Sequence, residues 1–270
     1  MCGPRMRPAT MERRRFLTSL GAGGVGVVLL GACSSGDSGS SATTGGPTTT
    51  ATTAPTSTTT VTTVEATDDA AASESVAEVQ LLTVELGFVS AFVLLRGDEA
   101  AIVDTGVSGS ERDIIDSLVE LDIGPSQVRH VVLTHKHGDH VGALEGILAE
   151  TTRATVYAGE GDIDAISASV PVSAVAEGDE ILGLGVVETP GHTPGSISLF
   201  DTGTGLLVAG DAINGSGQVL TGANPDFSED LDVARQSVAK LAALQPRVAA
   251  FGHVGPPVTT DVTAQLAALA

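Results

Sequence analysis

The chain has 270 residues, of which 13 are basic and 33 acidic, so its formal net charge at pH 7 is −20. Such an acidic protein repels phosphate backbones, which argues against a nucleic-acid partner. Its two cysteines, Cys2 and Cys33, both precede the folded part predicted below. Any metal site in that part must therefore be built from His, Asp and Glu side chains.

The N-terminal region has the features of an export signal, predicted over residues 1–33. Consecutive arginines precede a short, weakly apolar run that ends at Cys33. This run is shorter than the roughly 20 apolar residues that a membrane-spanning helix needs, so the pattern favours a signal over a spanning anchor.

Two short motifs in this region predict how the protein is exported and held. The segment RRRFL resembles a twin-arginine signal, and LGAC resembles a bacterial lipobox, in which the cysteine becomes lipidated. We therefore expect export by the twin-arginine route and an extracytoplasmic protein, anchored to a bacterial cell membrane by a lipid on Cys33. The alternative is an ordinary secretory signal with an incidental cysteine.

Residues 34–75 consist mainly of Ser, Thr, Ala, Gly and Pro, with almost no large apolar side chains. Such a segment buries too little surface to offset the entropy lost on ordering, which predicts a disordered tether. The tether would join the lipid anchor to one folded domain over residues 76–270, which is long enough for a sizeable core.

The first half of this domain predicts strands that lead to a helix and then to a histidine-rich segment. Short apolar runs broken by turn residues indicate three strands, at 79–86, 89–95 and 100–103. An amphipathic helix follows, with Ser110 at a capping position and Gly124-Pro125 at its end. The run VRHVVL at 128–133 is then predicted to be a buried strand.

The second half predicts further short strands in ATVYA, GVVETPG, SISLFD and GLLVAG. A helix is expected within 229–246, a strand at 248–251 and a closing helix within 258–270. Two strand-rich halves, each with its own helices, indicate an α/β fold of layered sheets covered on the outside by helices.

The segment THKHGDH follows the strand at 128–133 and places four potential ligands in one short stretch: His135, His137, Asp139 and His140. Imidazole and carboxylate groups are both good zinc ligands. Three more candidates, His192, Asp211 and His253, each lie at a junction between a strand and a loop. Together these seven residues predict a metal site.

The order and spacing of these residues resemble the H-x-H-x-D-H motif and the later ligands of the metallo-β-lactamase superfamily. The resemblance implies an αββα four-layer sandwich with a dinuclear site between the sheets, holding two Zn²⁺ ions. It assigns His135, His137 and His192 to one metal and Asp139, His140 and His253 to the other, with Asp211 bridging both. Thr134 and Asp104 would support the ligands through hydrogen bonds.

The function implied by the resemblance is that of a zinc hydrolase acting on a small molecule. A metal-bridging hydroxide would attack an ester, thioester, lactone or amide, with Asp139 orienting the nucleophile and carrying a proton. The loops after Gly106, at 167–172 and at 215–227 are expected to shape the substrate pocket. No protein partner is predicted.

Two other functions fit the same residues. The same resemblance also implies, as an alternative, a mononuclear iron persulfide dioxygenase of this superfamily, which would hold one Fe²⁺ with His135, His192 and Asp211 as a facial triad. A non-catalytic lipoprotein would capture metal at the cell surface without any turnover.

Overall fold

The computed structural model describes residues 58–63, 77–253 and 255–270. The predicted export signal, the lipidation site at Cys33 and most of the predicted tether lie outside these described residues. Within the described residues, no helix has the length and apolar character required to cross a membrane.

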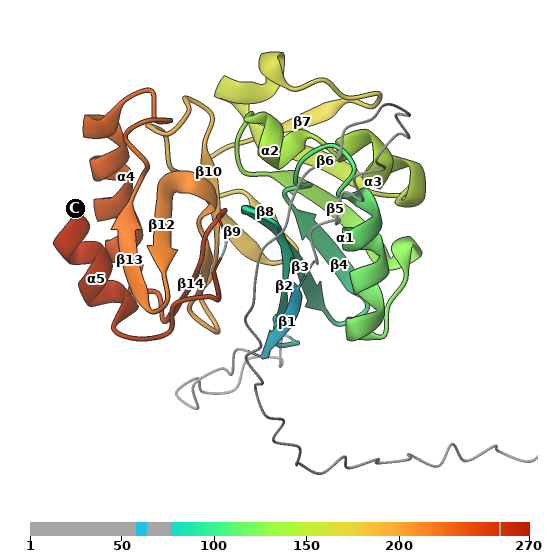
Figure 1. Cartoon of the computed structure of the whole chain (residues 1–270), viewed down its shortest axis with the longest axis horizontal. Helices are drawn as coiled ribbons and strands as arrows, with labels where there is room; N and C mark the ends of the chain where they lie inside the picture. The colour runs from blue at the N-terminus through green and yellow to red at the C-terminus, as the bar shows by residue number, and fades with distance from the viewer. Residues whose placement is uncertain (1–57, 64–76, 254) are drawn as a thin grey trace, which may run out of the picture. The chain divides into compact units, whose positions relative to one another are not determined.

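Seven strands form the first sheet, in the order β1 to β7 along the chain (Figure 1). Strands β1 to β4 pair antiparallel, whereas the pairs from β4 to β7 are parallel. The strands are β1 (Thr58–Thr63), β2 (Gln80–Leu86), β3 (Val89–Arg96), β4 (Glu99–Val103), β5 (Val128–Leu133), β6 (Thr155–Gly159) and β7 (Val172–Val175).

Helical segments make the parallel connections of this sheet, as parallel strands require. The connection from β4 to β5 contains α1, that from β5 to β6 contains α2 and α3, and that from β6 to β7 contains a 3₁₀ segment. These segments are α1 (Glu111–Ser117), η1 (Leu118–Leu121), η2 (Pro125–Gln127), α2 (Gly138–Val141), α3 (Leu144–Glu150) and η3 (Glu160–Ala165).

The second sheet has the strand order β14-β11-β10-β9-β8, and a separate hairpin is formed by β12 and β13. Its strands are β8 (Glu180–Ile181), β9 (Leu184–Glu188), β10 (Ile197–Asp201), β11 (Leu206–Val208) and β14 (Val248–Ala250). The hairpin is β12 (Ile213–Ser216) and β13 (Val219–Gly222), and the remaining helical segments are η4 (Gly210–Ala212), α4 (Leu231–Ala243) and α5 (Val262–Leu269).

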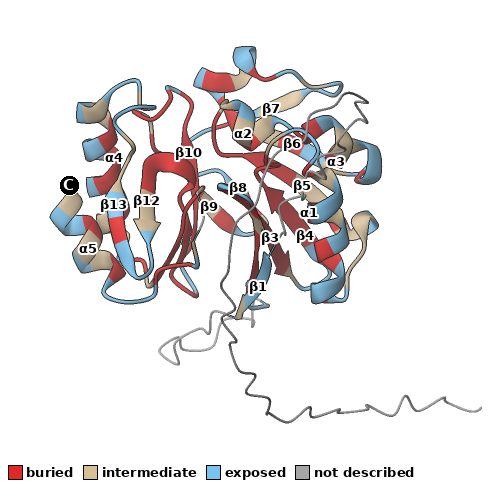
Figure 2. Cartoon of the chain, viewed as in Figure 1, coloured by how far each residue is buried: buried red, intermediate tan, exposed pale blue. Residues whose placement is uncertain are grey.

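Alternating side chains let each strand contribute to two layers of core. In β3, Ala91 and Val93 face a cluster shared with α1 and α3, while Phe92 and Leu94 face a cluster shared with the second sheet. A third cluster joins the other face of the second sheet to Leu241 of α4 and to α5. The buried residues therefore form layers between the helices and sheets (Figure 2). The predicted αββα four-layer sandwich is confirmed.

The segment predicted to be a disordered tether contains six residues that form the strand β1. Residues Thr58–Thr63 pair antiparallel with β2, from Thr58 opposite Glu85 to Thr63 opposite Gln80. Low apolar content predicted disorder here, but threonine and valine have high β-propensity and the free edge of β2 supplies backbone partners. An edge strand needs no buried side chains, and Val61 is exposed.

Other elements differ in extent from the prediction. The helix α1 ends at Ser117 and continues as the 3₁₀ segment η1, which stops at Asp122, a residue with φ of 56°. The Ser110 side chain makes no capping hydrogen bond. The predicted loop at 215–227 contains most of the β12–β13 hairpin. These short segments carry too few residues for a periodic pattern to be visible.

An ion pair between the two sheets predicts part of the pH dependence of stability. Arg96 of β3 pairs with the buried Asp201 of β10, which also accepts hydrogen bonds from the Thr204 N–H at 2.7 Å and hydroxyl at 2.5 Å. Burial alone would raise the pKa of Asp201, but the Thr204 and Arg96 hydrogen bonds outweigh it and lower that pKa below its usual 3.8. The stabilisation is therefore present above pH 3.8 and is lost as the pH falls further.

The variant Asp201→Asn should lower the free energy of unfolding at pH 7 by about 1–3 kcal/mol, since it leaves Arg96 without its charged partner. Urea unfolding at pH 5 and pH 3 should show a smaller loss of stability on acidification than in the wild-type protein. An unchanged acid dependence would contradict this assignment. Asp226→Asn, a change at an exposed carboxylate, is the control.

Candidate metal centre

The seven predicted ligands all follow the carboxyl ends of strands. His135 and His137 lie just after β5, while Asp139 and His140 lie in the single turn of α2 that follows. His192 lies in the loop after β9, Asp211 in the 3₁₀ turn after β11, and His253 after β14. The cluster was predicted as one tight loop, but its second half is helical.

The structure brings all seven residues together. Three overlapping groups have their ligand atoms within 4.8 Å of one another: His135 with His137 and His192, His135 with His140 and Asp211, and Asp139 with His140 and His253. The first and third groups are the two sets that the sequence resemblance assigned to separate metals. The Asp211 carboxylate lies between them, with Oδ1 3.5 Å from His140 Nε2 and Oδ2 3.5 Å from His192 Nε2.

Unpaired polar atoms inside this cluster fit bound cations. His135 Nε2, His140 Nε2 and Asp211 Oδ1 are buried and have no hydrogen-bond partner among the described residues. Each buried polar atom without a hydrogen-bond partner destabilises the fold by about 1–3 kcal/mol. Three such atoms in one cluster indicate that a ligand binds them. Imidazole nitrogens and carboxylate oxygens are donors suited to zinc and to iron. The residues present therefore fit a metal centre.

The protonation states of two histidines also suit metal binding. Burial lowers the pKa of His135 well below 6.5, and the neighbouring histidines lower it further. Burial likewise lowers the pKa of His192, to about 4, although Asp211 acts in the opposite direction. Both imidazoles are therefore neutral at pH 7, the form in which an imidazole binds a cation through a ring nitrogen.

Acidic side chains raise the pKa values of two other histidines in the cluster, His140 and His253. Burial lowers the pKa of His140, but Asp104, Asp211 and Asp139 outweigh it and raise the value to about 9. The hydrogen bond to Asp211 at 3.0 Å raises the pKa of His253. Burial raises the pKa of Asp211, yet His253 and His140 outweigh it and lower that value. A cation bound at His140 Nε2 must therefore displace a proton.

Asp104 and Thr134 hold this corner of the site by hydrogen bonds. The fully buried Asp104 carboxylate accepts from the Thr134 N–H and hydroxyl, each at 2.7 Å, and from His140 Nδ1 at 2.8 Å. Because Nδ1 of His140 carries that proton, Nε2 is the nitrogen that faces the cluster. Asp104 itself has φ of 60°, in the left-handed region.

A backbone carbonyl and a hydroxyl group orient two further histidines, and no sequence motif indicated these hydrogen-bond partners. The Phe88 carbonyl accepts from His253 Nδ1 at 2.8 Å, which leaves Nε2 for the cluster. The Ser228 hydroxyl lies 3.2 Å from His192 Nδ1. These partners are 165 and 36 residues away along the chain, so only the folded structure reveals them.

Asp162 is a buried residue that sequence reasoning missed. Its carboxylate accepts from the Lys136 N–H at 2.9 Å, the Thr193 hydroxyl at 2.5 Å and the Gly195 N–H at 2.9 Å. It thereby joins the segment carrying His135 and His137 to the loop carrying His192. No local signal distinguishes it from Asp164, which is exposed.

We expect Asp162→Asn to weaken metal binding by about 10- to 100-fold, because the amide replaces an acceptor and the two ligand loops lose a shared anchor. Metal affinity is measured by competition with a coloured chelator. Asp164→Asn, the same change two residues further on, should stay within about twofold of the wild type. Equal affinities in the two variants would show that Asp162 does not position the ligands.

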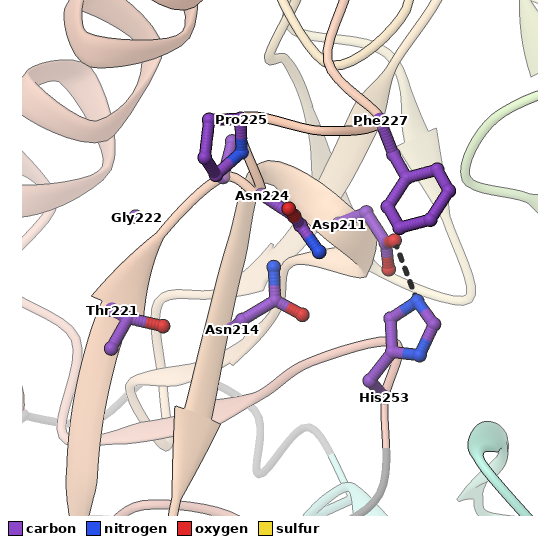
Figure 3. Close-up of a pocket in the computed structure, with 9 residues that line it drawn as sticks. Asp211, Asn214, Thr221, Gly222, Asn224, Pro225, Phe227 and His253 are labelled. Carbon is purple, nitrogen blue, oxygen red and sulfur yellow. Dashed lines mark hydrogen bonds and ion pairs between the residues drawn. The ribbon is translucent and has the colours of Figure 1, made fainter.

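A pocket of about 520 Å³ opens next to the cluster, with Asp211 and His253 in its wall (Figure 3). Its other lining residues come from the β12–β13 hairpin and the loop that follows: Asn214, Thr221, Gly222, Ala223, Asn224, Pro225 and Phe227. The segment 215–227, predicted to shape the pocket, therefore does so. The loops after Gly106 and at 167–172 contribute no lining residue.

Comparisons with known proteins agree with this site. The family described as the Metallo-beta-lactamase superfamily matches residues 84–253. The chain is 30% identical over 235 residues to the probable metallo-hydrolase YflN of Bacillus subtilis (strain 168), an alignment covering 70% of this chain and 88% of that protein.

Two more relatives are informative. The hydroxyacylglutathione hydrolase of Dechloromonas aromatica (strain RCB) is 31% identical over 159 residues, covering 55% of this chain and 56% of that enzyme. The crystal structure of the metallo-beta-lactamase family protein TTHA1429 from Thermus thermophilus superposes with a TM-score of 0.54 at 24% identity. That alignment covers 67% of this chain and 73% of that chain, and it shows a shared fold.

The family match spans more than half of the chain and includes the whole ligand cluster. The chain therefore belongs to the metallo-β-lactamase superfamily and is a metal-dependent hydrolase of that family.

Proposed function

We propose that the protein is a dinuclear zinc hydrolase that cleaves an ester, thioester, lactone or amide bond of a small molecule. The observation that carries the proposal is the pair of three-residue donor groups on either side of Asp211, with unpaired buried atoms turned toward one another. His135, His137 and His192 would hold one ion, and Asp139, His140 and His253 the other. Asp211 would contact both.

Two bound divalent cations would supply a deprotonated water at neutral pH and stabilise negative charge on the carbonyl oxygen of the substrate. The remaining step, transfer of a proton, falls to a side chain of the protein. Asp139 Oδ2 lies 3.9 Å from the Nε2 atoms of both His140 and His253, and its side chain is partly exposed. It is therefore placed to accept a proton at the boundary between the cluster and solvent.

Metal content and turnover test this proposal together. The full chain is purified, its zinc and iron are quantified, and it is assayed against chromogenic esters, thioesters, lactones and amides. About two zinc ions per chain with metal-dependent hydrolysis support the proposal. One iron per chain with oxygen consumption on a persulfide would instead establish the dioxygenase, and tight metal without any turnover would establish a metal-capturing lipoprotein.

Asp139→Asn separates catalysis from metal capture, because the amide keeps an oxygen that can bind the metal but is a far weaker proton acceptor than a carboxylate. If Asp139 carries a proton, this change should reduce the turnover rate about 100-fold or more while most of the metal is retained. A variant that keeps wild-type turnover would remove Asp139 from the mechanism.

The location of the protein is part of the proposal. RRRFL and LGAC support twin-arginine export and a lipid anchor at Cys33 on the outer face of a bacterial cell membrane. Lysine at both Arg13 and Arg14 should block export, and Cys33→Ser should release the exported protein from the membrane fraction. Unimpaired export of the lysine variant would contradict the twin-arginine route.

A further inference from the structure

The described residues that line the pocket beside the metal centre include no lysine or arginine. The polar groups of this wall are the neutral side chains of Asn214, Thr221 and Asn224, together with the Asp211 carboxylate and the His253 imidazole. A carboxylate or phosphate on a bound substrate would therefore find no lysine or arginine to pair with in this wall. The metal ions proposed at Asp211 and His253 would face the reacting carbonyl, so a charge at the far end of an acyl chain would stay unpaired against this wall, which is costly.

Three basic side chains outside the pocket are paired with acidic residues. Lys136 Nζ lies 2.7 Å from Glu229, and Lys240 Nζ lies 2.9 Å from Glu177. Arg235 lines a separate cavity behind Gly222 and pairs with Asp232. None of these three side chains lines the pocket.

The pocket instead offers apolar surface and an amide. Phe227 lines it and is 67% exposed, although a side chain of this size is normally covered in a folded protein. Phe88, 59% exposed, is not a lining residue but stacks on the lining residue His253, with ring centroids 6.2 Å apart. Asn214 Nδ2 is buried and has no hydrogen-bond partner among the described residues. Figure 3 shows the Asn214 amide and the Phe227 ring on different sides of the same space.

We infer that the substrate carries an uncharged, apolar acyl chain, which lies against Phe227 while a polar atom of the substrate meets the Asn214 amide. This inference rests on the proposed hydrolase function and names its substrate class. Substrates with an anionic group on the acyl chain would be poor. In each reaction one water adds across the carbonyl, the bond from carbon to the leaving atom breaks, and a carboxylate and the protonated or ionised leaving group are released.

A matched pair of acyl chains tests the inference on the full, metal-loaded protein. Hexanoyl and monoadipoyl groups have the same number of carbons and differ in one terminal carboxylate. Both are attached to p-nitrophenol, thiophenol and p-nitroaniline, which covers ester, thioester and amide linkages. We expect kcat/KM for the hexanoyl compound to exceed that for the adipoyl compound by about 50-fold or more, after correction for hydroxide-catalysed hydrolysis.

Measurements at high salt show whether the preference for the hexanoyl compound arises in the pocket or from the negative charge of the whole protein. Repulsion by distant surface charges is largely screened at about 0.5 M KCl, whereas the absence of lysine and arginine from the pocket wall is unaffected by salt. The preference should therefore persist at high salt. A preference that disappears with salt would overturn the inference.

Two variants probe the wall directly. Thr221 is exposed on β13, so Thr221→Lys adds a cation at the pocket with little disturbance of the fold. It should reduce the hexanoyl preference about tenfold, whereas the neutral variant Thr221→Gln should keep it. Phe227→Ala should reduce the preference for hexanoyl over acetyl compounds roughly tenfold, as expected if about two CH₂ groups lose their contact.

The outcomes separate this inference from the proposed function. Absence of metal-dependent hydrolysis of every compound would overturn the proposed function and the inference together. Hydrolysis with equal rates for the hexanoyl and adipoyl compounds, or with faster adipoyl cleavage, would overturn the inference alone. An unchanged chain-length preference in Phe227→Ala would exclude Phe227 as the acyl contact.

Discussion

Replacing Gly252 with alanine should abolish most of the metal binding and reduce hydrolysis at least about 100-fold, although Gly252 is not itself a ligand. A Cβ atom at this position would lie 2.1 Å from Asp211 Oδ1 and 2.6 Å from His140 Cε1. The backbone cannot easily move away, because the Gly252 N–H donates to the Gly210 carbonyl at 3.0 Å and its carbonyl accepts from the Ser90 N–H at 2.7 Å. The Asp211 carboxylate must therefore leave its place between the two groups of donors.

Metal stoichiometry and urea unfolding of the metal-free protein measure the two consequences of Gly252→Ala separately. The variant should lose metal, while the overpacked site lowers the free energy of unfolding by about 1–3 kcal/mol. Gly124→Ala is the matched control, since a Cβ there meets nothing within 4 Å. A Gly252→Ala protein that binds two metals with wild-type affinity would show that the Asp211 position is not fixed by its neighbour.

Asp104→Asn should weaken metal binding by about 10- to 100-fold and destabilise the metal-free protein by about 1–3 kcal/mol. The wild-type carboxylate accepts three hydrogen bonds, two from Thr134 and one from His140. An amide presents a donor in place of one oxygen, so at least one of these buried donors loses its acceptor. Where the amide nitrogen replaces Oδ2, His140 lacks the bond that directs its Nε2 toward the cluster, and where it replaces Oδ1, the Thr134 N–H lacks its acceptor.

Measuring metal affinity and folding of the same variant tests whether Asp104 positions His140. Chelator competition should show weaker metal binding in Asp104→Asn even under conditions where circular dichroism shows the variant to be fully folded. Asp98→Asn, which changes an exposed carboxylate in the β3–β4 turn, serves as the control. Wild-type affinity in a folded Asp104→Asn protein would indicate that Asp104 contributes to stability alone.

Much of the candidate site could be predicted because its residues form recognisable local patterns. Four of the seven lie within the six positions of HKHGDH, and His192, Asp211 and His253 each sit beside glycine near the end of an apolar strand. The sheets were predictable for a similar reason: apolar runs such as VVL in β5 are short and buried.

The remaining features depend on contacts between distant parts of the chain. Asp162 becomes a support only because two loops meet at its carboxylate. The Phe88 carbonyl orients His253 because the β2–β3 turn approaches the end of β14. Neither composition nor periodicity records such contacts. The strand β8 has two residues, too few for any alternation to be read.

The strand β1 has a consequence for any shortened form of the protein. It covers the outer side of β2 over six residue pairs, so a chain cut at residue 76, where the sequence places the start of the domain, leaves that side of β2 bare. A bare strand edge presents a row of unpaired N–H and C=O groups and invites pairing with a neighbouring molecule. The threonine-rich segment therefore protects this edge against self-association. A protein that begins before Thr58 should stay soluble at concentrations where one that begins at residue 76 aggregates.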